Sequence, residues 1–261
     1  MEISDLKPPV LFISDAHLGG FSEQENQRIE SDLIQLINYC QRNQIQLAIL
    51  GDLFDYWMEY PDYVPKLGQK LLERFKDYNR KMGPTLYITG NHDNWTRQHF
   101  TDLGFLLKHE QVELTINETT LMVLHGDGLK NPDLQLQRPR MHRLLRAPKF
   151  IDIYQKVFPP KMGITLMKYF SKLTRTLEWN PNKKDRLNKW AGHQLKATDL
   201  DVLICGHDHM PRRKQFTFGT YINLGTFYRH KTMALYNNDA ISLVCWESDT
   251  QSLKNFDAKD L

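Results

Sequence analysis

Short apolar runs of strand length recur along the chain, and most of them end in a polar stretch. The first three are residues 10–14, 46–50 and 85–89. Between them, over 22–43 and 66–81, apolar residues recur at helical spacing. Ser22 and Glu25 form a capping box at the start of the first of these helices. The alternation of strand and helix predicts an α/β fold with a parallel, helix-flanked sheet.

The pattern changes after residue 110. Segments 112–116 and 120–124 flank a short polar turn, which predicts a β-hairpin. Further apolar runs predict the strands that complete the sheet, and they lie at 201–205, 221–224, 233–236 and 241–246. The last dozen residues are polar, and we expect them to be frayed.

Residues 129–196 differ from the rest, because they are basic, rich in aromatic residues and interrupted by prolines. We expect them to form a helical insertion in a core made of 1–128 and 197–261. Within it, 163–179 predicts an amphipathic helix. Its apolar stripe consists of Ile164, Met167, Phe170, Leu173 and Leu177. This stripe either packs on the main domain, lines an apolar ligand groove or rests on a membrane surface.

Charge is distributed unevenly along the 261 residues, although the net charge is only +3. Residues 129–196 contain sixteen Lys and Arg against four Asp and Glu, a local balance of +12 that leaves −9 for the remainder. Such a segment favours an anionic partner, namely a phosphate, an acidic lipid surface or nucleic acid, unless it is simply a solvated basic face.

Composition is typical of a soluble globular protein, with 41% hydrophobic and 25% charged residues. No apolar stretch is long enough to span a membrane, and the first residues do not resemble a secretory signal. The three cysteines, Cys40, Cys205 and Cys245, are scattered without CxxC spacing. They indicate reduced thiols in a cytoplasmic protein. Cys205 lies inside an apolar run, which argues against a nucleophilic role.

Polar motifs with potential metal ligands follow five of the strand-like runs directly. They are Asp15-Ala16-His17, Gly51-Asp52-Leu53-Phe54-Asp55, Gly90-Asn91-His92-Asp93, Leu124-His125-Gly126-Asp127 and Gly206-His207-Asp208-His209. Loops at strand ends are where α/β folds place their chemistry. Their candidate ligands are Asp15, His17, Asp52, Asn91, His125, His207 and His209. This mixed nitrogen and oxygen set suits first-row divalent metals, and it is too large for one tetrahedral ion.

A shared carboxylate, Asp52, predicts two ions about 3.5–4 Å apart, the arrangement of a binuclear hydrolase. His92 follows the candidate ligand Asn91 and is placed to give a proton to the leaving oxygen. Asp93 is a candidate partner for the His92 ring, and Asp55 a candidate acceptor for a ligand histidine. The other histidines fall outside the motifs, and they are His99, His109, His142, His193 and His230.

The ordered set of motifs, from residue 10 to residue 209, resembles the calcineurin-like metallophosphoesterase superfamily. The resemblance implies a β-sandwich flanked by helices, with two manganese ions. One ion would be bound by Asp15, His17, Asp52 and His209, and the other by Asp52, Asn91, His125 and His207.

Within that superfamily, the motifs around Asp15, Asp52 and His125 resemble those of the UDP-2,3-diacylglucosamine hydrolases of lipid A biosynthesis. The resemblance implies that 129–196 is a lid enclosing an acyl-chain chamber. It also implies a substrate contact from Asp133, and we expect Asn91, His92 and His207 to contact the substrate as well. The chain departs from the family at His92, where many members have Arg. The departure is compatible with a divergent branch of the family and equally with a relative that acts on another phosphoester.

The leading hypothesis is therefore a Mn²⁺-dependent pyrophosphatase that converts UDP-2,3-diacylglucosamine to UMP and the diacylated sugar phosphate. An acylated substrate and the basic insertion predict a peripheral position on the cytoplasmic face of the inner membrane. The alternative is a hydrolase of a nucleotide or another soluble phosphodiester. A binding module without catalysis would require a broken ligand set, whereas this set is complete. No docking motif supports nucleic acid as a partner.

Overall fold

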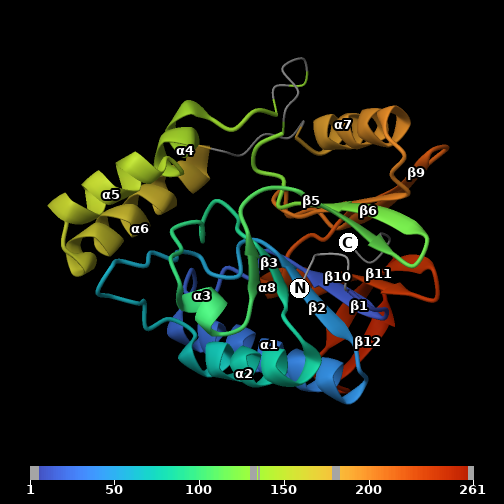
Figure 1. Ribbon diagram of the computed structural model, residues 1–261, viewed down its shortest axis with the longest axis horizontal. Coiled ribbons are helices and arrows are strands. Elements are labelled where there is room, and N and C mark those ends of the chain that lie inside the picture. Colours follow the sequence, from blue (N-terminus) through green and yellow to red (C-terminus); the bar gives the residue numbers. More distant parts are fainter. Residues whose placement is uncertain (1–5, 130–133, 135, 178–182, 258–261) are drawn as a thin grey trace.

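Two β-sheets pack face to face, and helices cover the outer face of each sheet (Figure 1). The computed structural model describes residues 6–129, 134, 136–177 and 183–257, except for the side chains of 170–177 and 183–185. The sequence-based prediction of an α/β sandwich flanked by helices is confirmed.

The larger sheet has seven strands in the order β12-β11-β10-β1-β2-β3-β4. They are β1 Val10–Ile13, β2 Gln46–Leu50, β3 Leu86–Ile88, β4 Leu106–Lys108, β10 Thr232–Asn237, β11 Ala240–Glu247 and β12 Ser252–Asn255. Strands β1 to β4 pair in parallel, whereas β10 to β12 join antiparallel. Because β1, β2 and β3 are parallel, the loops that follow them meet at one edge of the sheet.

The smaller sheet has five strands in the order β5-β6-β7-β9-β8. They are β5 Val112–Ile116, β6 Thr119–Val123, β7 Val202–Cys205, β8 Arg212–Phe216 and β9 Gly219–Asn223. Strands β5 and β6 form the predicted hairpin. Strand β7 then pairs in parallel with β6, although the insertion separates the two in sequence. The loops after β6 and β7 therefore also leave the sheet at a common edge.

Helices α1 Glu23–Arg42 and α2 Gln69–Met82 lie side by side on the outer face of the larger sheet (Figure 1). Helix α1 begins where the capping box predicts, since Ser22 Oγ accepts a hydrogen bond from the Glu25 amide at 3.3 Å. Helix α2 starts later than residue 66, because its N-cap Gly68 adopts a left-handed conformation. Two single-turn helices, α3 His99–Asp102 and α8 Phe227–His230, contribute Phe100 and Phe227 to the hydrophobic cluster under α1 and α2.

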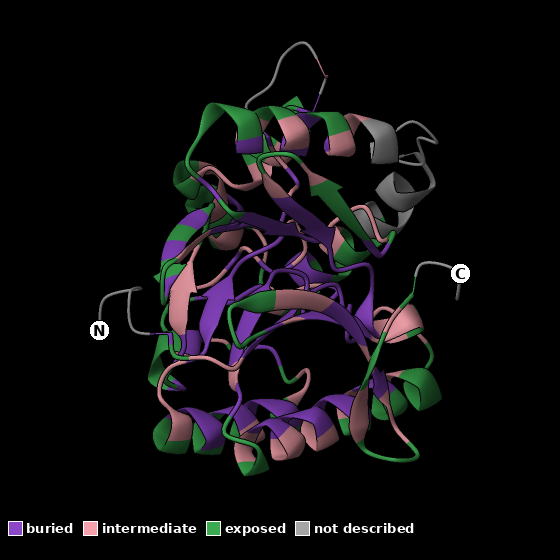
Figure 2. Ribbon diagram, turned by 90° about the vertical axis from the view of Figure 1, so that its right-hand side faces the viewer, coloured by how far each residue is buried: buried purple, intermediate pink, exposed green. Residues whose placement is uncertain are grey.

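Strand residues alternate between two hydrophobic layers, as a period of two requires. Val10 and Phe12 are buried between the two sheets, in a cluster that also contains Val123 and Ile204 of the smaller sheet. Leu11 and Ile13 instead belong to the cluster under α1 and α2. Figure 2 shows the buried residues concentrated in the sandwich and on the inner faces of the helices. Each fully buried aliphatic side chain contributes about 1.5–3 kcal/mol to this packing.

The described residues between β6 and β7 form four helices: α4 Arg140–Leu145, α5 Pro148–Val157, α6 Pro160–Leu177 and α7 Lys183–Ala197. Helix α7 covers the outer face of the smaller sheet, where Leu187 and Trp190 are buried. Helices α4 to α6 stand beside the sandwich (Figure 1). They join it through an aromatic cluster that includes Tyr60, Trp95 and Tyr154.

Helix α6 contains the apolar stripe predicted from the sequence. Ile164 is buried in the aromatic cluster and Met167 packs against it, so this part of the stripe packs on the core. The side chains of Phe170, Leu173 and Leu177 lie outside the described residues.

The predicted fraying of the last twelve residues is wrong for Ser252–Asn255. These residues form β12, which pairs antiparallel with β11. The backbone N–H of Phe256 then donates to the Leu243 carbonyl at 2.9 Å. Polar side chains are compatible with this strand, because it lies at the edge of the sheet and is partly exposed to water.

Candidate metal centre

The predicted ligands come together from both sheets, at the edge where the strand-end loops meet. Asp15 and His17 follow β1, Asp52 follows β2 and Asn91 follows β3 in the larger sheet. His125 follows β6, and His207 and His209 follow β7 in the smaller sheet. No single element contains the site, so it exists only once the sandwich has formed.

The backbone is strained at five of the seven candidate ligands. Their φ angles are 51° at Asp15, 47° at His17, 53° at Asp52, 70° at His207 and 61° at His209. Residues other than glycine rarely adopt this left-handed region, and those that do are concentrated at functional sites. At each of these positions the left-handed conformation turns the side chain toward the other candidate ligands, a direction that an extended backbone would not give it.

Two glycines allow the backbone to approach the carboxylates closely. A Cβ atom on Gly206 would overlap Oδ2 of Asp15, and one on Gly90 would overlap Oδ1 of Asp52. This closeness lets the His207 amide donate a hydrogen bond to Asp15 Oδ2 at 3.0 Å. The glycines of the motifs thus fix the carboxylates against the backbone.

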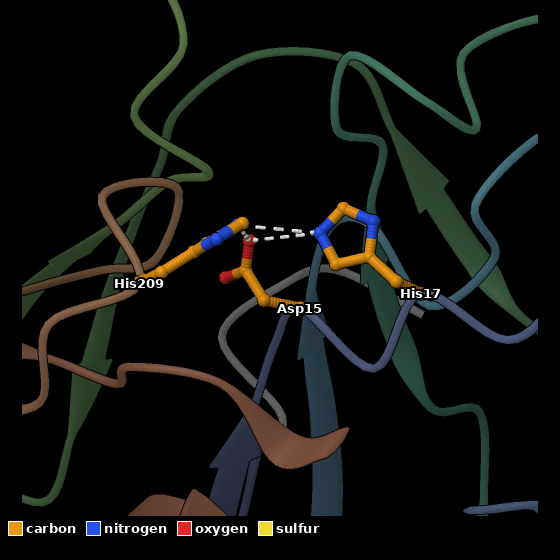
Figure 3. Close-up of side chains that lie close together, drawn as sticks. All are labelled: Asp15, His17 and His209. Carbon is orange, nitrogen blue, oxygen red and sulfur yellow. Dashed lines mark hydrogen bonds and ion pairs between the residues drawn. The ribbon is translucent and has the colours of Figure 1, made fainter. Parts of the chain in front are cut away.

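Asp15, His17 and His209 form the first ligand group (Figure 3). Nε2 of His209 lies 3.1 Å from Asp15 Oδ1, and Nε2 of His17 lies 3.7 Å from the same oxygen. The two Nε2 atoms are 3.3 Å apart. Asp15 Oδ1 is buried, and among the described residues it accepts no hydrogen bond. A buried oxygen facing two ring nitrogens fits a divalent cation.

Asp52, His125 and His207 form the second group. Nε2 of His125 lies 3.2 Å from Asp52 Oδ2 and 3.1 Å from Asn91 Oδ1. The same Asp52 oxygen lies 3.8 Å from Nε2 of His17 in the first group. Asp52 therefore lies between the two groups, as the sequence predicts for a bridging carboxylate.

The outward ring nitrogens are held by protein acceptors. Nδ1 of His17 donates to Asp55 Oδ1 at 3.2 Å, and Nδ1 of His125 donates to the Leu50 carbonyl at 2.9 Å. These contacts direct Nε2 of each ring toward the carboxylates, which is how proteins orient metal-binding histidines. Asp55 thus has the position predicted for an acceptor behind a ligand.

Opposite charges dominate the electrostatics of the site. Burial lowers the pKa of His17, but the neighbouring carboxylates of Asp15 and Asp55 outweigh it and raise this pKa to about 10. Burial is likewise outweighed at His125, where Asp52 raises the pKa to about 10. The histidines in turn hold the pKa values of Asp15 and Asp52 below their usual range despite burial. Bound cations would replace these protons.

His92 lies against the first group, with its ring centroid 4.9 Å from that of His17. Its Nδ1 donates to the Asp55 carbonyl at 2.8 Å, so the ring presents Nε2 away from the backbone. Burial lowers the pKa of His92.

Asp93 does not hold the His92 ring, contrary to the interpretation from sequence. Its carboxylate accepts hydrogen bonds from the Gly90 amide at 2.7 Å, the Leu53 amide at 2.9 Å and the Tyr87 hydroxyl at 2.6 Å. Burial, followed by repulsion from Asp52, raises the pKa of Asp93 to about 6. Asp93 therefore fixes the two loops that hold Asp52 and Asn91.

Sequence reasoning missed a second set of charges behind the ligands. Asp127 Oδ2 lies 3.0 Å from Arg138 Nε and 3.0 Å from an Arg146 nitrogen. Arg146 also donates to the Gly90 carbonyl at 2.6 Å. Despite burial, Arg146 and His125 hold the pKa of Asp127 below its usual range. The sequence showed only that residues 129–196 are basic. It did not indicate which arginines point toward the ligand loops.

The remaining sequence-based predictions concern residues away from the ligand groups. Asp133 lies outside the described residues. The metal-ligand groups of the described part of the chain contain none of the five other histidines. Cys205 is a buried free thiol whose pKa burial raises to about 12, which agrees with its exclusion as a nucleophile.

Comparisons with known proteins gave matches in both sequence and structure. A family model described as calcineurin-like phosphoesterase matches residues 8–211. A UDP-2,3-diacylglucosamine hydrolase of Porphyromonas gingivalis is 25% identical over 222 residues, which cover 78% of this chain and 84% of that protein.

A second protein of that name, from Shewanella piezotolerans, is 27% identical over 237 residues, which cover 90% and 96% of the two chains. Among solved structures, the E. coli phosphoesterase Yfce aligns with a TM-score of 0.46 and 18% identity, covering 94% of this chain and 95% of that one.

Proposed function

Since the chain belongs to the calcineurin-like phosphoesterase family, we propose that it hydrolyses the pyrophosphate of UDP-2,3-diacylglucosamine. The products would be UMP and 2,3-diacylglucosamine 1-phosphate, an intermediate of lipid A biosynthesis. The observation that carries the hydrolytic chemistry is Asp52, whose carboxylate lies between two ligand groups. The substrate rests on relatives that bear the hydrolase name and align over most of their length.

The site would hold two divalent ions, with manganese as the proposed metal. The ligands proposed for one ion are Asp15, His17, Asp52 and His209, and those for the other are Asp52, Asn91, His125 and His207. Ions bound there would activate a water molecule and offset the charge on the phosphoryl group.

The protein's own groups would orient the phosphate and supply a proton. The Asn91 amide, beside His125 Nε2, faces the second ligand group and would bind a phosphate oxygen. His92 would donate a proton from Nε2 to the leaving oxygen, because its Nδ1 is already engaged with the Asp55 carbonyl. Asp93 would act by fixing the loops, as its hydrogen bonds to backbone amides suggest. His207 and Asp133 remain proposed substrate contacts.

We also propose that 129–196 acts as a lid over a core of 1–128 and 197–261. Helix α7 and the Asp127–Arg146 ion pair join this segment to both the smaller sheet and the ligand loops. An acylated substrate requires access to a lipid surface, so we infer a peripheral position on the inner membrane. None of the described helices is long and apolar enough to cross a membrane.

Parallel turnover assays test the proposal. With Mn²⁺ present, wild type should hydrolyse UDP-2,3-diacylglucosamine, and Asp52→Asn should lose at least about a hundredfold in kcat, because that variant weakens both ion sites. Bis-p-nitrophenyl phosphate serves as the generic diester. Turnover of this diester without turnover of the lipid would refute the lipid assignment. It would support the alternative substrate class of soluble phosphodiesters.

A further inference from the structure

The short loop after β7 provides one ligand to each ion site. His209 belongs to the group of Asp15, and His207 belongs to the group of Asp52. Both histidines have left-handed backbone conformations, with φ of 70° at His207 and 61° at His209. A small change in this loop would therefore displace ligands of both ions at once.

The start and the end of the loop are held by different contacts. At its start, the His207 amide donates to Asp15 Oδ2 at 3.0 Å, and Asn223 donates to the Gly206 carbonyl at 2.8 Å. Beyond His207 the packing is weaker, since the His209 side chain is 40% exposed. The ring of His209 contacts Asp15 and the rings of His17 and Tyr228, and its position also depends on what fixes the backbone around it.

Arg212 supplies that constraint. Its Nη2 forms an ion pair with Asp208 Oδ2 at 2.6 Å, with side chains only 7% and 2% exposed. Its Nη1 donates to the Met210 carbonyl at 2.8 Å. Asp208 Oδ1 in turn accepts from the Met210 amide at 3.1 Å. The guanidinium thus holds the side chain before His209 and the carbonyl after it.

The same guanidinium is fixed from behind by two other elements. Its Nε donates to Asn188 Oδ1 at 2.8 Å, on helix α7. Its Nη2 also donates to the Tyr221 hydroxyl at 3.1 Å, on β9. A planar fork with donors in several directions can make all these contacts at once, whereas a lysine ammonium offers a single point of charge.

We propose that Arg212 is a positioning residue for the metal centre, which sets His207 and His209 through Asp208. The inference rests on the proposed function, because it takes these histidines to be metal ligands. Through Asn188, it also joins helix α7 to the ligand loop. Arg212 touches neither ion nor substrate in this role, so its effect is on metal affinity and geometry.

Calorimetric titration with Mn²⁺ tests the inference without any substrate. In Asp208→Asn and Arg212→Gln, the Mn²⁺ dissociation constant should rise at least about tenfold, as losses behind a ligand typically do. The double variant should bind Mn²⁺ only slightly more weakly than either single variant, because the two residues act as a pair. Arg212→Lys retains the positive charge but loses the planar set of donors. Its Mn²⁺ dissociation constant should therefore lie between those of wild type and Arg212→Gln.

Asp32→Asn is the matched control, since it breaks another ion pair of a mostly buried carboxylate, between Asp32 Oδ2 and Lys231 Nζ at 2.7 Å. It should lower the melting temperature while leaving Mn²⁺ affinity unchanged. Paramagnetic resonance of the bound Mn²⁺ gives a second measurement, because a displaced ligand alters the coupling between the two ions. Arg212→Gln and Asp208→Asn should change this spectrum, and Asp32→Asn should not.

Wild-type affinity and an unchanged spectrum in folded Asp208→Asn and Arg212→Lys would overturn the inference while leaving the proposed function intact. Equal weakening by Asp32→Asn would also overturn it, because the effect would then be one of general stability. If Arg212→Gln does not fold, the nearly isosteric Asp208→Asn decides. A wild-type chain that binds no Mn²⁺ at all would refute the metal centre itself, and the inference with it.

Discussion

At the scale of single residues, His92 is the candidate proton donor, and its ring lies against the first ligand group. Removing the ring in His92→Ala should lower kcat about 10²- to 10⁴-fold, the usual range for general acid catalysis. Mn²⁺ affinity should change much less than kcat, because His92 is not a proposed ligand of either ion, its Nδ1 is engaged with the Asp55 carbonyl, and its ring meets the ligand His17 only edge to face.

The pH profile distinguishes proton donation from charge stabilisation by His92. If the ring donates a proton, wild-type kcat falls as pH rises through the pKa of His92, which burial lowers. His92→Arg retains positive charge over that range, so the fall should disappear. An identical alkaline fall in His92→Arg would contradict the acid role. His99→Gln provides a control, since His99 stacks on Trp57 away from the ligand groups.

At the scale of elements, the sequence was most informative where chemistry and local structure coincide. The meeting of the candidate ligands could be predicted because each follows a buried strand, as Asp52 follows β2. The strands that were missed are β4, β8 and β12, and all three lie at sheet edges. An edge strand pairs with a neighbour on one side only, so it can be short or polar, as Arg212–Phe216 of β8 is. The hydrogen bond between Arg212 and Asn188 joins two segments that are distant in sequence, and a local sequence pattern does not predict such a contact.

Helices α5 and α6 support a prediction about membrane attachment. Ile153 and Val157 on α5 are each 63% exposed, and Tyr169 on α6 is 72% exposed. Exposed lysines, among them Lys149 and Lys156, flank the α5 residues. Apolar side chains bordered by basic ones are typical of a surface that rests on anionic lipid.

Replacing Ile153, Val157 and Tyr169 together by Ser should reduce cosedimentation with anionic vesicles roughly tenfold or more. Turnover of bis-p-nitrophenyl phosphate should remain at the wild-type level, because these side chains point to solvent. Higher salt should weaken binding of wild type, as expected for the lysine contribution. Unchanged cosedimentation of the triple variant would place the membrane contact elsewhere on the molecule.

At the scale of the whole molecule, the metal centre joins the two sheets of the sandwich. Asp52 comes from the larger sheet and His125 from the smaller one, and without metal they attract one another as charges. The pKa of His125 and of His17 is about 10 in the folded chain, above the ordinary value of 6.5. Folding therefore takes up protons between these pH values, and the stability of the metal-free chain must decrease as pH rises through that range.

Bound Mn²⁺ should reverse this dependence, because it needs the unprotonated rings and competes with their protons. We expect the melting temperature of the metal-free protein to fall from pH 7 to pH 10, and the increase caused by Mn²⁺ to grow from pH 6 to pH 8. Calorimetric scans in chelator and in excess Mn²⁺ measure both slopes. In a protein of this size, each kcal/mol of unfolding free energy shifts the melting temperature by about 2–4 °C. His125→Gln should make the metal-free slope shallower, leaving the contribution of His17, and should reduce the Mn²⁺ effect. A metal-free slope as steep as that of wild type would mean that His125 does not titrate over this range, and that the two sheets are not coupled through its pair with Asp52.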